Sequence, residues 1–442
     1  MSIVETPHEP AAAAGATPGP PAGGRPPGTL PDTVASPVQR RAQGWIPLLA
    51  IYSVTAFVES LGVSQVFAFM PQYLLHMGVP DAEIGQTVGV LSSLVFVLGL
   101  PLVPLWGVWA DKYSRKAVII RSAIVEAIVF AAVALSRTPW QLGASLLLVG
   151  FQLGNTGVML AAIRDSAPRR RLGTAIALFG ASSPIGFAVG PALGGVMIDG
   201  LHLPISSVYA FAAVLSVAVA VLLALGSREV RPEVVPTGSV RSLAFGAVRG
   251  VLTDRATMGL FGIFGLAFLA RQLANPFLPL LVRQLNGDVG LASAIALVVG
   301  TAALAGALVS PLTGAFGDRI GFRPVLLASL CGGAVALLAM PVAPSVPALA
   351  GLVVVFAACS AGVSAMVFGL LAMELPPERR SATLNLVYLP LYVSGIAGPA
   401  LGAAIVGAGL GTVFVLGGVL MTLAGVLVAS VLIHGARAHR LA

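Results

Sequence analysis

The sequence predicts an all-α membrane protein whose twelve transmembrane helices form two pseudo-symmetric six-helix bundles. Hydrophobic residues make up 57% of the chain and charged residues only 10%, whereas about a quarter of an ordinary soluble domain is charged. Twelve apolar segments each have the roughly 20 residues that a helix needs to cross a bilayer. Several short motifs recur about 208 residues apart (for one motif, 398 minus 190), which indicates two related halves.

The apolar segments are predicted to be helices because every backbone amide in lipid must be hydrogen-bonded internally. They cover approximately residues 46–74, 84–109, 117–136, 141–163, 172–198, 206–226, 257–282, 290–316, 322–341, 347–373, 380–406 and 411–434. The first six define an N-terminal bundle over residues 45–226, and the last six define a C-terminal bundle over residues 256–442.

Two segments outside the bundles differ from them in composition. Residues 1–44 are rich in Pro, Ala and Gly and are expected to form a disordered cytoplasmic tail. Residues 227–255 form the cytoplasmic linker between the halves. Their later part spaces apolar residues as an amphipathic helix does, so it either lies on the anionic inner leaflet or is a solvated linker.

The net charge of +8 is a signal of membrane topology. Of 25 Lys and Arg residues, only Arg137 and Arg283 fall in the odd-numbered connections between helices, and Arg271 lies inside the seventh segment. The positive-inside rule therefore places both termini in the cytoplasm. This distribution argues against nucleic-acid binding, and the high Ala, Gly, Pro and Arg content suggests a bacterial inner-membrane protein.

Motifs for enzymatic chemistry are not found in the sequence. The two cysteines lie in apolar segments and the five histidines are scattered, so neither a metal site nor a Ser/His/Asp triad is expected. The phosphate-binding loop of ATP-driven pumps is also missing. We therefore expect no cofactor, no metal and no enzyme activity.

The internal repeat has three landmarks. The sequence GPALG occurs at 190–194 and at 398–402, GVWADKYSRK at 107–116 corresponds to GDRIGFR at 317–323, and APRRRLGTA corresponds to PPERRSAT. Small residues spaced by four let membrane helices approach closely, and Pro191 and Pro399 bend their helices. The residues of this helix-kink motif are Gly186, Gly190, Pro191, Gly194, Gly195, Gly398, Pro399 and Gly402.

With these motifs the chain resembles the major facilitator superfamily, and in particular its twelve-helix drug:proton antiporters. The superfamily's motif between helices two and three matches Gly107, Asp111, Lys112, Arg115 and Lys116, with Ser114 in place of a glycine, and its second copy matches Gly314, Asp318, Arg319, Gly321 and Arg323. The resemblance implies that Asp111 gates the cytoplasmic side by meeting the N-terminus of helix eleven. Alternatively, the basic residues serve only to set topology.

The first GPALG copy, completed by Gly195, also resembles the helix-five signature of drug:proton antiporters. Its duplicate in helix eleven leaves open whether the motif reports antiport or packing symmetry. The antiporters' usual helix-four arginine is missing, because Val149 and Gly150 stand where it would fall. Proton coupling would then depend on another residue.

Three ionisable residues lie deep in predicted helices, namely Glu59, Glu126 and Arg271. Charges at this depth mark functional sites. Glu59 is predicted to carry a proton or anchor a cationic substrate, unless it forms a permanent ion pair with Arg271 across the central cavity. Arg271 would bind an anionic substrate or compensate Glu59. Glu126 is expected near the periphery, partly compensated by Arg121.

The cavity is expected to be mostly apolar with few polar groups, which suits lipophilic substrates. Its uncharged polar candidates are Gln65, Gln152, Asn155, Thr156, Gln272, Asn275, Tyr388 and Tyr392. The first functional hypothesis is a monomeric secondary transporter that works by alternating access and exports lipophilic or cationic compounds in exchange for protons. The alternatives are uptake or flipping of an amphipathic metabolite, lipid or organic anion at Arg271, and a non-transporting membrane sensor.

Overall fold

A computed structural model describes residues 44–232, 235, 237–252, 255–374 and 389–441. These residues contain twelve helical spans long and apolar enough to cross a membrane, and no strand. The prediction of an all-α membrane protein with twelve spanning helices is confirmed. The predicted tail and the predicted start of the eleventh segment lie outside the described residues.

The N-terminal half contains six spans, several of them built from two shorter helices. Kinks and breaks occur where proline or glycine interrupts the hydrogen-bond ladder. The spans are α2 (Trp45–His76), α3 with α4 (Asp81–Val97 and Gly99–Lys112), α5 (Arg115–Leu135), α6 with η1 and α7 (Pro139–Leu148, Val149–Phe151 and Asn155–Ser166), α8 with η3 (Leu172–Gly195 and Val196–Gly200) and α9 (Ile205–Gly226).

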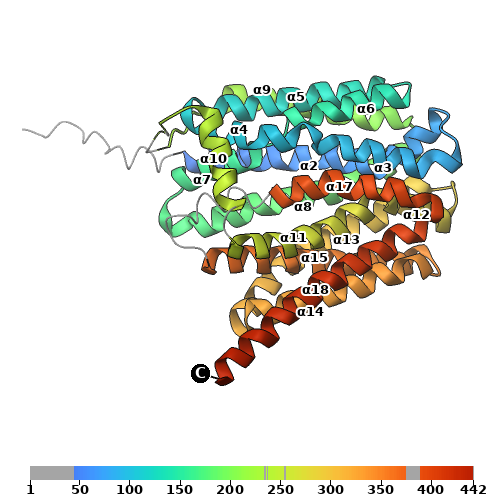
Figure 1. Cartoon of the computed structure of the whole chain (residues 1–442). Helices are drawn as coiled ribbons and strands as arrows, with labels where there is room; N and C mark the ends of the chain where they lie inside the picture. The colour runs from blue at the N-terminus through green and yellow to red at the C-terminus, as the bar shows by residue number, and fades with distance from the viewer. Residues whose placement is uncertain (1–43, 233–234, 236, 253–254, 375–388, 442) are drawn as a thin grey trace, which may run out of the picture. The chain divides into compact units, whose positions relative to one another are not determined.

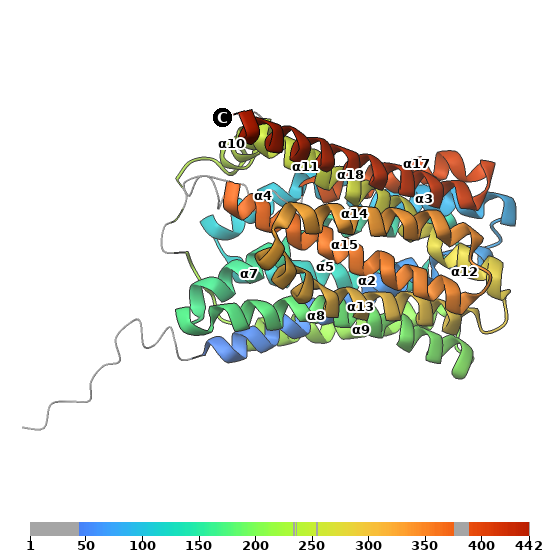
Figure 2. The ribbon, with the colours of Figure 1, turned by 90° about the horizontal axis from the view of Figure 1, so that it is seen from below.

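The C-terminal half repeats this order after the linker helix α10 (Val240–Leu252). Its spans are α11 with η4 and α12 (Arg255–Ala274, Asn275–Phe277 and Leu278–Asn286), α13 (Leu291–Ile320), α14 with η5 (Phe322–Ala339 and Met340–Val342), α15 (Val346–Glu374), α17 with η6 (Leu389–Ile405 and Val406–Ala408) and α18 (Leu410–Leu441). Figures 1 and 2 show that α10 and the last turns of α18 lie at the same end of the helices. We call this the α10 end, and the opposite end, where α3 begins, the Asp81 end.

The two halves meet along two pairs of helices. On one side α8 packs against α13, and on the other α3 packs against α17. Small residues make both approaches close, because a side-chain carbon at Gly89 would lie 2.6 Å from the Pro399 carbonyl oxygen and one at Gly300 would lie 3.2 Å from that of Ala188. This agrees with the role of small residues in membrane helix packing.

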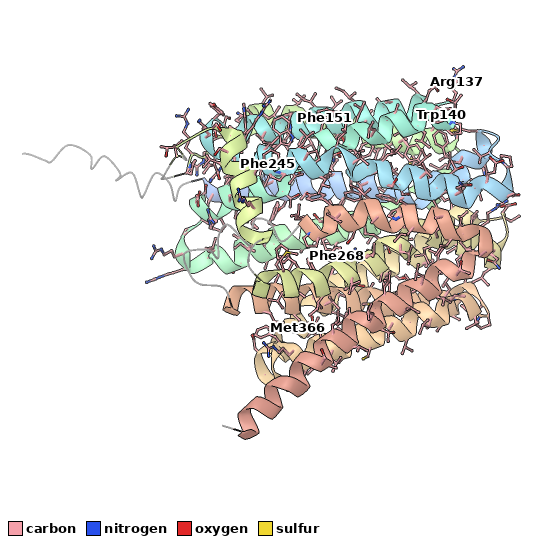
Figure 3. All side chains as sticks on the ribbon, viewed as in Figure 1. Arg137, Trp140, Phe151, Phe245, Phe268 and Met366 are labelled. Carbon is pink, nitrogen blue, oxygen red and sulfur yellow. The ribbon has the colours of Figure 1, made fainter. Side chains whose placement is uncertain are left out.

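The linker contains a real helix rather than only solvated coil. Helix α10 contacts both α4 of the first half and α11 of the second, and Figure 1 shows it lying across the helix ends. Ala244 faces inward, whereas Phe245, labelled in Figure 3, is exposed. An apolar residue facing outward beside Arg241 and Arg249 is the pattern of an interfacial helix.

Candidate transport site

Glu59 lies in the middle of α2 and is held by two side-chain amides. The Asn155 Nδ2 atom donates to Glu59 Oε2 at 2.9 Å, and the Gln152 Nε2 atom donates to Glu59 Oε1 at 3.4 Å. The side chain of Glu59 is partly exposed. A carboxylate that accepts two amide hydrogens is fixed in position but is not neutralised.

The two amides reach Glu59 because the fourth membrane span, made of α6, η1 and α7, is broken beside them. The helix narrows into the short η1 segment and restarts after Gly154, whose φ of 97° is left-handed. Glycine adopts this conformation without the cost a Cβ atom brings. The break places Gln152 and Asn155 on either side of the turn, so that both side chains can point to one carboxyl group.

Glu126 lies inside the N-terminal half, not at its periphery as the sequence suggested. Its side chain on α5 is 3% exposed, and its Oε1 atom lies 3.0 Å from Ser216 Oγ on α9. The reason is the close packing of α5 against α9. Helices α2 and α5 contact each other, so the structure places Glu59 and Glu126 on neighbouring helices, which the sequence alone does not show.

Arg121 does not compensate Glu126. Its guanidinium stacks over the Trp106 ring at 3.8 Å and donates to the Leu153 carbonyl oxygen at 3.3 Å. Among the described residues no ion pair involves Arg121. This stacking directs the Arg121 guanidinium toward the break between η1 and α7. The expectation that Arg121 compensates the charge of Glu126 is therefore wrong.

Arg271 is separate from Glu59. It lies 5.8 Å from the ring of Phe268, which is labelled in Figure 3, and it lines a small pocket of about 10 Å³ with Ser360 and Ser364 of α15. In the described part of the chain it forms no ion pair with Glu59. The alternative of a permanent Glu59–Arg271 clasp is therefore wrong for this conformation.

The remaining polar candidates do not form one cluster. Gln65 is buried and donates to the Gly190 carbonyl oxygen at 3.2 Å, and Tyr392 stacks with Phe96 of the other half at 6.0 Å between ring centroids. Thr156 and Asn275 are exposed, and Gln272 is partly buried. Tyr388 lies outside the described residues.

The motif loop between α4 and α5 forms a buried charge cluster at the α10 end. Arg115 is 2% exposed and donates from Nε to Asp111 Oδ1 at 2.8 Å and from Nη1 to Asp165 Oδ2 at 2.7 Å. Glu229 of the linker accepts from the Arg115 backbone N–H at 2.9 Å. The cluster therefore connects α4, α5 and α7 to the start of the linker.

The two lysines of this loop bind backbone carbonyls of the same region. Lys112 Nζ donates to Gly238 O at 2.5 Å, and Lys116 Nζ donates to Ser227 O at 2.7 Å. Gly107 has open space around it. The N-terminus of helix eleven, which Asp111 is predicted to meet, lies in residues 375–388, outside the described residues.

The second copy of the motif differs from the first in burial. Asp318, Arg319 and Arg323 are exposed, and Gly314 has open space around it. Gly321, with φ of 96°, lets α13 turn directly into α14. The position equivalent to Arg115, 207 residues later, is Phe322, so this half packs a ring where the other half packs an ion pair.

The GPALG copies pack equivalent helix pairs. Gly194 of α8 lies against the Phe69 ring of α2, and Gly402 of α17 lies against the Phe277 ring. The spacing from Phe69 to Phe277 is 208 residues, the same as from Gly194 to Gly402. Gly186 and Gly190 also face α2, Gly398 faces Gln272 and Leu273, and Gly195 faces Ala292 of the other half.

Two polar contacts join the halves at the Asp81 end, and the sequence alone does not identify them. Arg283 donates to Asp81 at 2.6 Å and to Asp288 at 2.7 Å. Asp199 accepts from the Ser293 backbone N–H at 2.6 Å in the first turn of α13, where helix N–H groups are free. The isolated position of Arg283 in an odd-numbered connection is the one signal available in the sequence.

The hydrogen bond from Arg283 and its positive charge hold the pKa of the Asp288 carboxyl below its usual range. Arg283, Asp81 and Asp288 also line a cavity of about 590 Å³ between α3, α12 and η6. The Arg283 contacts at the Asp81 end therefore lie beside a cavity that both polar and apolar residues line.

Twelve membrane-spanning helices in two repeated halves, with the carboxyl groups of Glu59 and Glu126 within the first and third spans, define an integral membrane transporter rather than an enzyme. A family model described as Major Facilitator Superfamily matches residues 48–268 and 260–440. The chain belongs to the Major Facilitator Superfamily.

Two relatives and two solved structures illustrate its place in the superfamily. Multidrug resistance protein MdtG of Proteus mirabilis (strain HI4320) is 27% identical over 370 residues, which cover 82% of this chain and 90% of the relative. MdtG of Enterobacter lignolyticus (strain SCF1) is 29% identical over 296 residues, 65% of this chain and 68% of the relative.

The solved structures show the fold. The nucleoside transporter NupG aligns with a TM-score of 0.68 at 16% identity, over 87% of this chain and 98% of that one. The human organic anion transporter MFSD10 aligns with a TM-score of 0.64 at 18% identity, over 87% and 99%.

Proposed function

We propose that this protein is a secondary active transporter that works by alternating access and exports lipophilic cations in exchange for protons. The observation that carries the proposal is the setting of Glu59. Its carboxyl group lies at mid-depth, is partly exposed, and is held by amides of Gln152 and Asn155 rather than by a cation. Such a group can exchange a proton for a positively charged substrate.

Two further observations support export of lipophilic compounds. The relatives in Proteus mirabilis and Enterobacter lignolyticus are multidrug resistance proteins. The Gly-Pro motif of α8 lies between α2, which carries Glu59, and α13 of the opposite half. A close, kinked contact at this place would let the halves slide while Glu59 stays at the interface.

We place the α10 end in the cytoplasm of a bacterial inner membrane, with the protein acting as a monomer surrounded by lipid. The basic residues Lys112, Lys116 and Arg164 lie at this end, together with the Arg169–Arg171 turn. Basic residues are enriched on the cytoplasmic side. The cluster of Asp111, Arg115 and Asp165 would then be the cytoplasmic gate, with Asp111 available to the N-terminus of helix eleven.

Transport in proteoliposomes tests this function. Purified protein is reconstituted, a pH gradient is imposed, and movement of ethidium, which is permanently cationic, is followed against the gradient. We expect ethidium to accumulate on the acidic side and the accumulation to collapse when nigericin dissipates the gradient. Equal ethidium movement with and without the gradient would refute proton coupling.

A second candidate substrate class is supported by Arg271. This side chain lies beside Ser360 and Ser364 and forms no ion pair within the described residues. A guanidinium with hydroxyl groups nearby is suited to an anionic headgroup. The same proteoliposomes should be tested with a fluorescent organic anion, and transport of the anion that is lost in Arg271→Gln would favour this candidate over cation export.

A further inference from the structure

Glu59 and Glu126 lie on helix faces that touch. Gly62, one turn from Glu59 on α2, packs against the ring of Phe130, one turn from Glu126 on α5, so closely that a side-chain carbon at Gly62 would collide with the ring. Ser122, one turn before Glu126, donates to the Gln152 carbonyl oxygen, and the Gln152 side chain donates to Glu59. Contacts on both sides therefore connect the two carboxyl groups, which interact electrostatically.

Basic side chains do not balance this pair among the residues that the structure describes. The polar and charged groups that face the two carboxyl groups are Gln152 and Asn155 of the fourth membrane span, Ser216 of α9 and Ser122 of α5. Arg121, the nearest cation along α5, stacks on Trp106 instead. Two adjacent carboxylates without a counter-ion repel each other strongly away from water, so one of them holds a proton.

The hydrogen bonds of the two carboxyl groups indicate which one is protonated. The Ser216 Oγ atom donates to the Ala212 carbonyl oxygen at 2.9 Å and to Glu126 Oε1 at 3.0 Å. A hydroxyl group has one hydrogen, so Glu126 shares that single hydrogen with the Ala212 carbonyl oxygen. Glu59, in contrast, accepts from two amides, as an ionised carboxylate does.

Exposure separates the two acids further. Glu59 is partly exposed, whereas Glu126 is only 3% exposed. The accessible acid is therefore charged and the hidden acid is neutral. With this arrangement, a cation bound at Glu59 can cause Glu126 to release its proton without contacting Glu126.

We propose that Glu59 is the cation anchor and that Glu126 holds the exchangeable proton. This proposal rests on the proposed function and deepens it. When a lipophilic cation pairs with Glu59, its charge makes a second negative charge tolerable, the Oε–H bond of Glu126 breaks, and the proton passes to water. One bound cation thereby replaces one proton, and departure of the cation returns the proton to Glu126.

Proton release on binding tests the assignment. Tetraphenylphosphonium is added to the purified full-length protein in weakly buffered detergent solution near pH 7, and released protons are counted with a pH-indicator dye. Wild-type protein should release about one proton per bound cation, because the pair loses one proton on binding. Glu126→Gln should still bind the cation, but more weakly than wild type because its side chain cannot become negative, and should release no proton. Glu59→Gln should lose binding, and the exposed Glu83→Gln should behave as wild type.

The outcomes separate this proposal from the proposed function. Proton release that persists in Glu126→Gln, or loss of cation binding in it, would overturn the assignment to Glu126 while leaving proton-coupled export intact. Cation binding by the wild type without any proton release would overturn both. Should Glu126→Gln fail to fold, Ser216→Ala is the second test, because removing this donor to the Glu126 carboxylate should move the midpoint of proton release to higher pH. An unmoved midpoint would contradict the assignment.

Discussion

Arg115 and Phe322 occupy equivalent positions in the two halves but have opposite chemistry. Arg115 is buried between Asp111 and Asp165, whereas Phe322 packs against Gly317 and Gly369. A buried ion pair is weak evidence for stability, but removing one partner leaves an uncompensated charge. At this position the N-terminal half therefore depends on a buried charge, whereas the C-terminal half packs an aromatic ring.

Arg115→Ala should lower the free energy of unfolding by about 3 kcal/mol, the lower end of the cost of breaking a buried pair, because Asp111 is 39% exposed and partly solvated. Thermal unfolding of the purified protein in detergent measures this. The matched control is Arg164→Ala, whose side chain is 55% exposed and pairs with the same Asp165. A surface pair is worth about 0–1 kcal/mol, so equal losses in both variants would show that burial of Arg115 does not set its contribution.

The depth of a residue in the membrane can be predicted from the sequence, but its contacts cannot. Glu59, Gln152 and Asn155 are each recognisable as polar residues in apolar segments. Their meeting depends on the break at Gly154, and periodicity does not show where a membrane helix breaks. The burial of Glu126 depends on the rotation of α5 toward α9, and a helix that is apolar on all sides has no polar face from which that rotation could be inferred.

Helices α8 and α17 show that the repeated motif is a packing device in both halves. Gly194 and Gly402 each pack against an aromatic ring from the first membrane span of their own half. The four-residue spacing of the glycines predicts that these helices pack closely against a neighbour. It does not predict which aromatic rings they contact, since Phe69 and Phe277 lie far from their glycines in the sequence.

Gly194→Ala and Gly402→Ala should each destabilise the protein by about 1–3 kcal/mol, because an added methyl group overpacks a closed contact. Thermal unfolding again provides the measurement. The control is Gly180→Ala on the same helix α8, where the added carbon would meet nothing within 4 Å. Alanine favours helix by up to about 1 kcal/mol over glycine, so this control should be neutral or slightly stabilising. A loss as large as that of Gly194→Ala would show that the cost is not due to packing.

Across the whole molecule, the halves are held together at the Asp81 end by Arg283 and Asp199. Arg283→Ala should favour the conformation that opens there. Spin labels at Ala82→Cys and Gln284→Cys, in a background with Cys331→Ser and Cys359→Ser, report the opening by electron–electron distance measurement. Longer distances in Arg283→Ala are expected, and unchanged distances would show that Arg283 does not contribute to closure.

The Arg283–Asp288 ion pair lies within the C-terminal half and holds the guanidinium that reaches Asp81. It should be insensitive to pH in the physiological range. The pKa of Asp288 is lowered by Arg283, so its contribution to stability is present above the ordinary Asp pKa of about 3.9 and is lost as pH falls through the lower folded-state value. Distances between the labels should therefore not respond to this ion pair between about pH 5 and pH 8. A pH-dependent opening in that range that disappears in Arg283→Ala would contradict this.

Cation binding at Glu59 is the central claim of the proton-antiport proposal, and gradient-driven transport by Glu59→Gln tests it. Ethidium and an uncharged dye are compared in proteoliposomes under an imposed pH gradient, with wild type, Glu59→Gln and the exposed Glu83→Gln. We expect the gradient to drive ethidium transport in wild type and Glu83→Gln but not in Glu59→Gln. Gradient-driven ethidium transport that survives in Glu59→Gln would place the coupling site elsewhere and contradict the proposed role of Glu59.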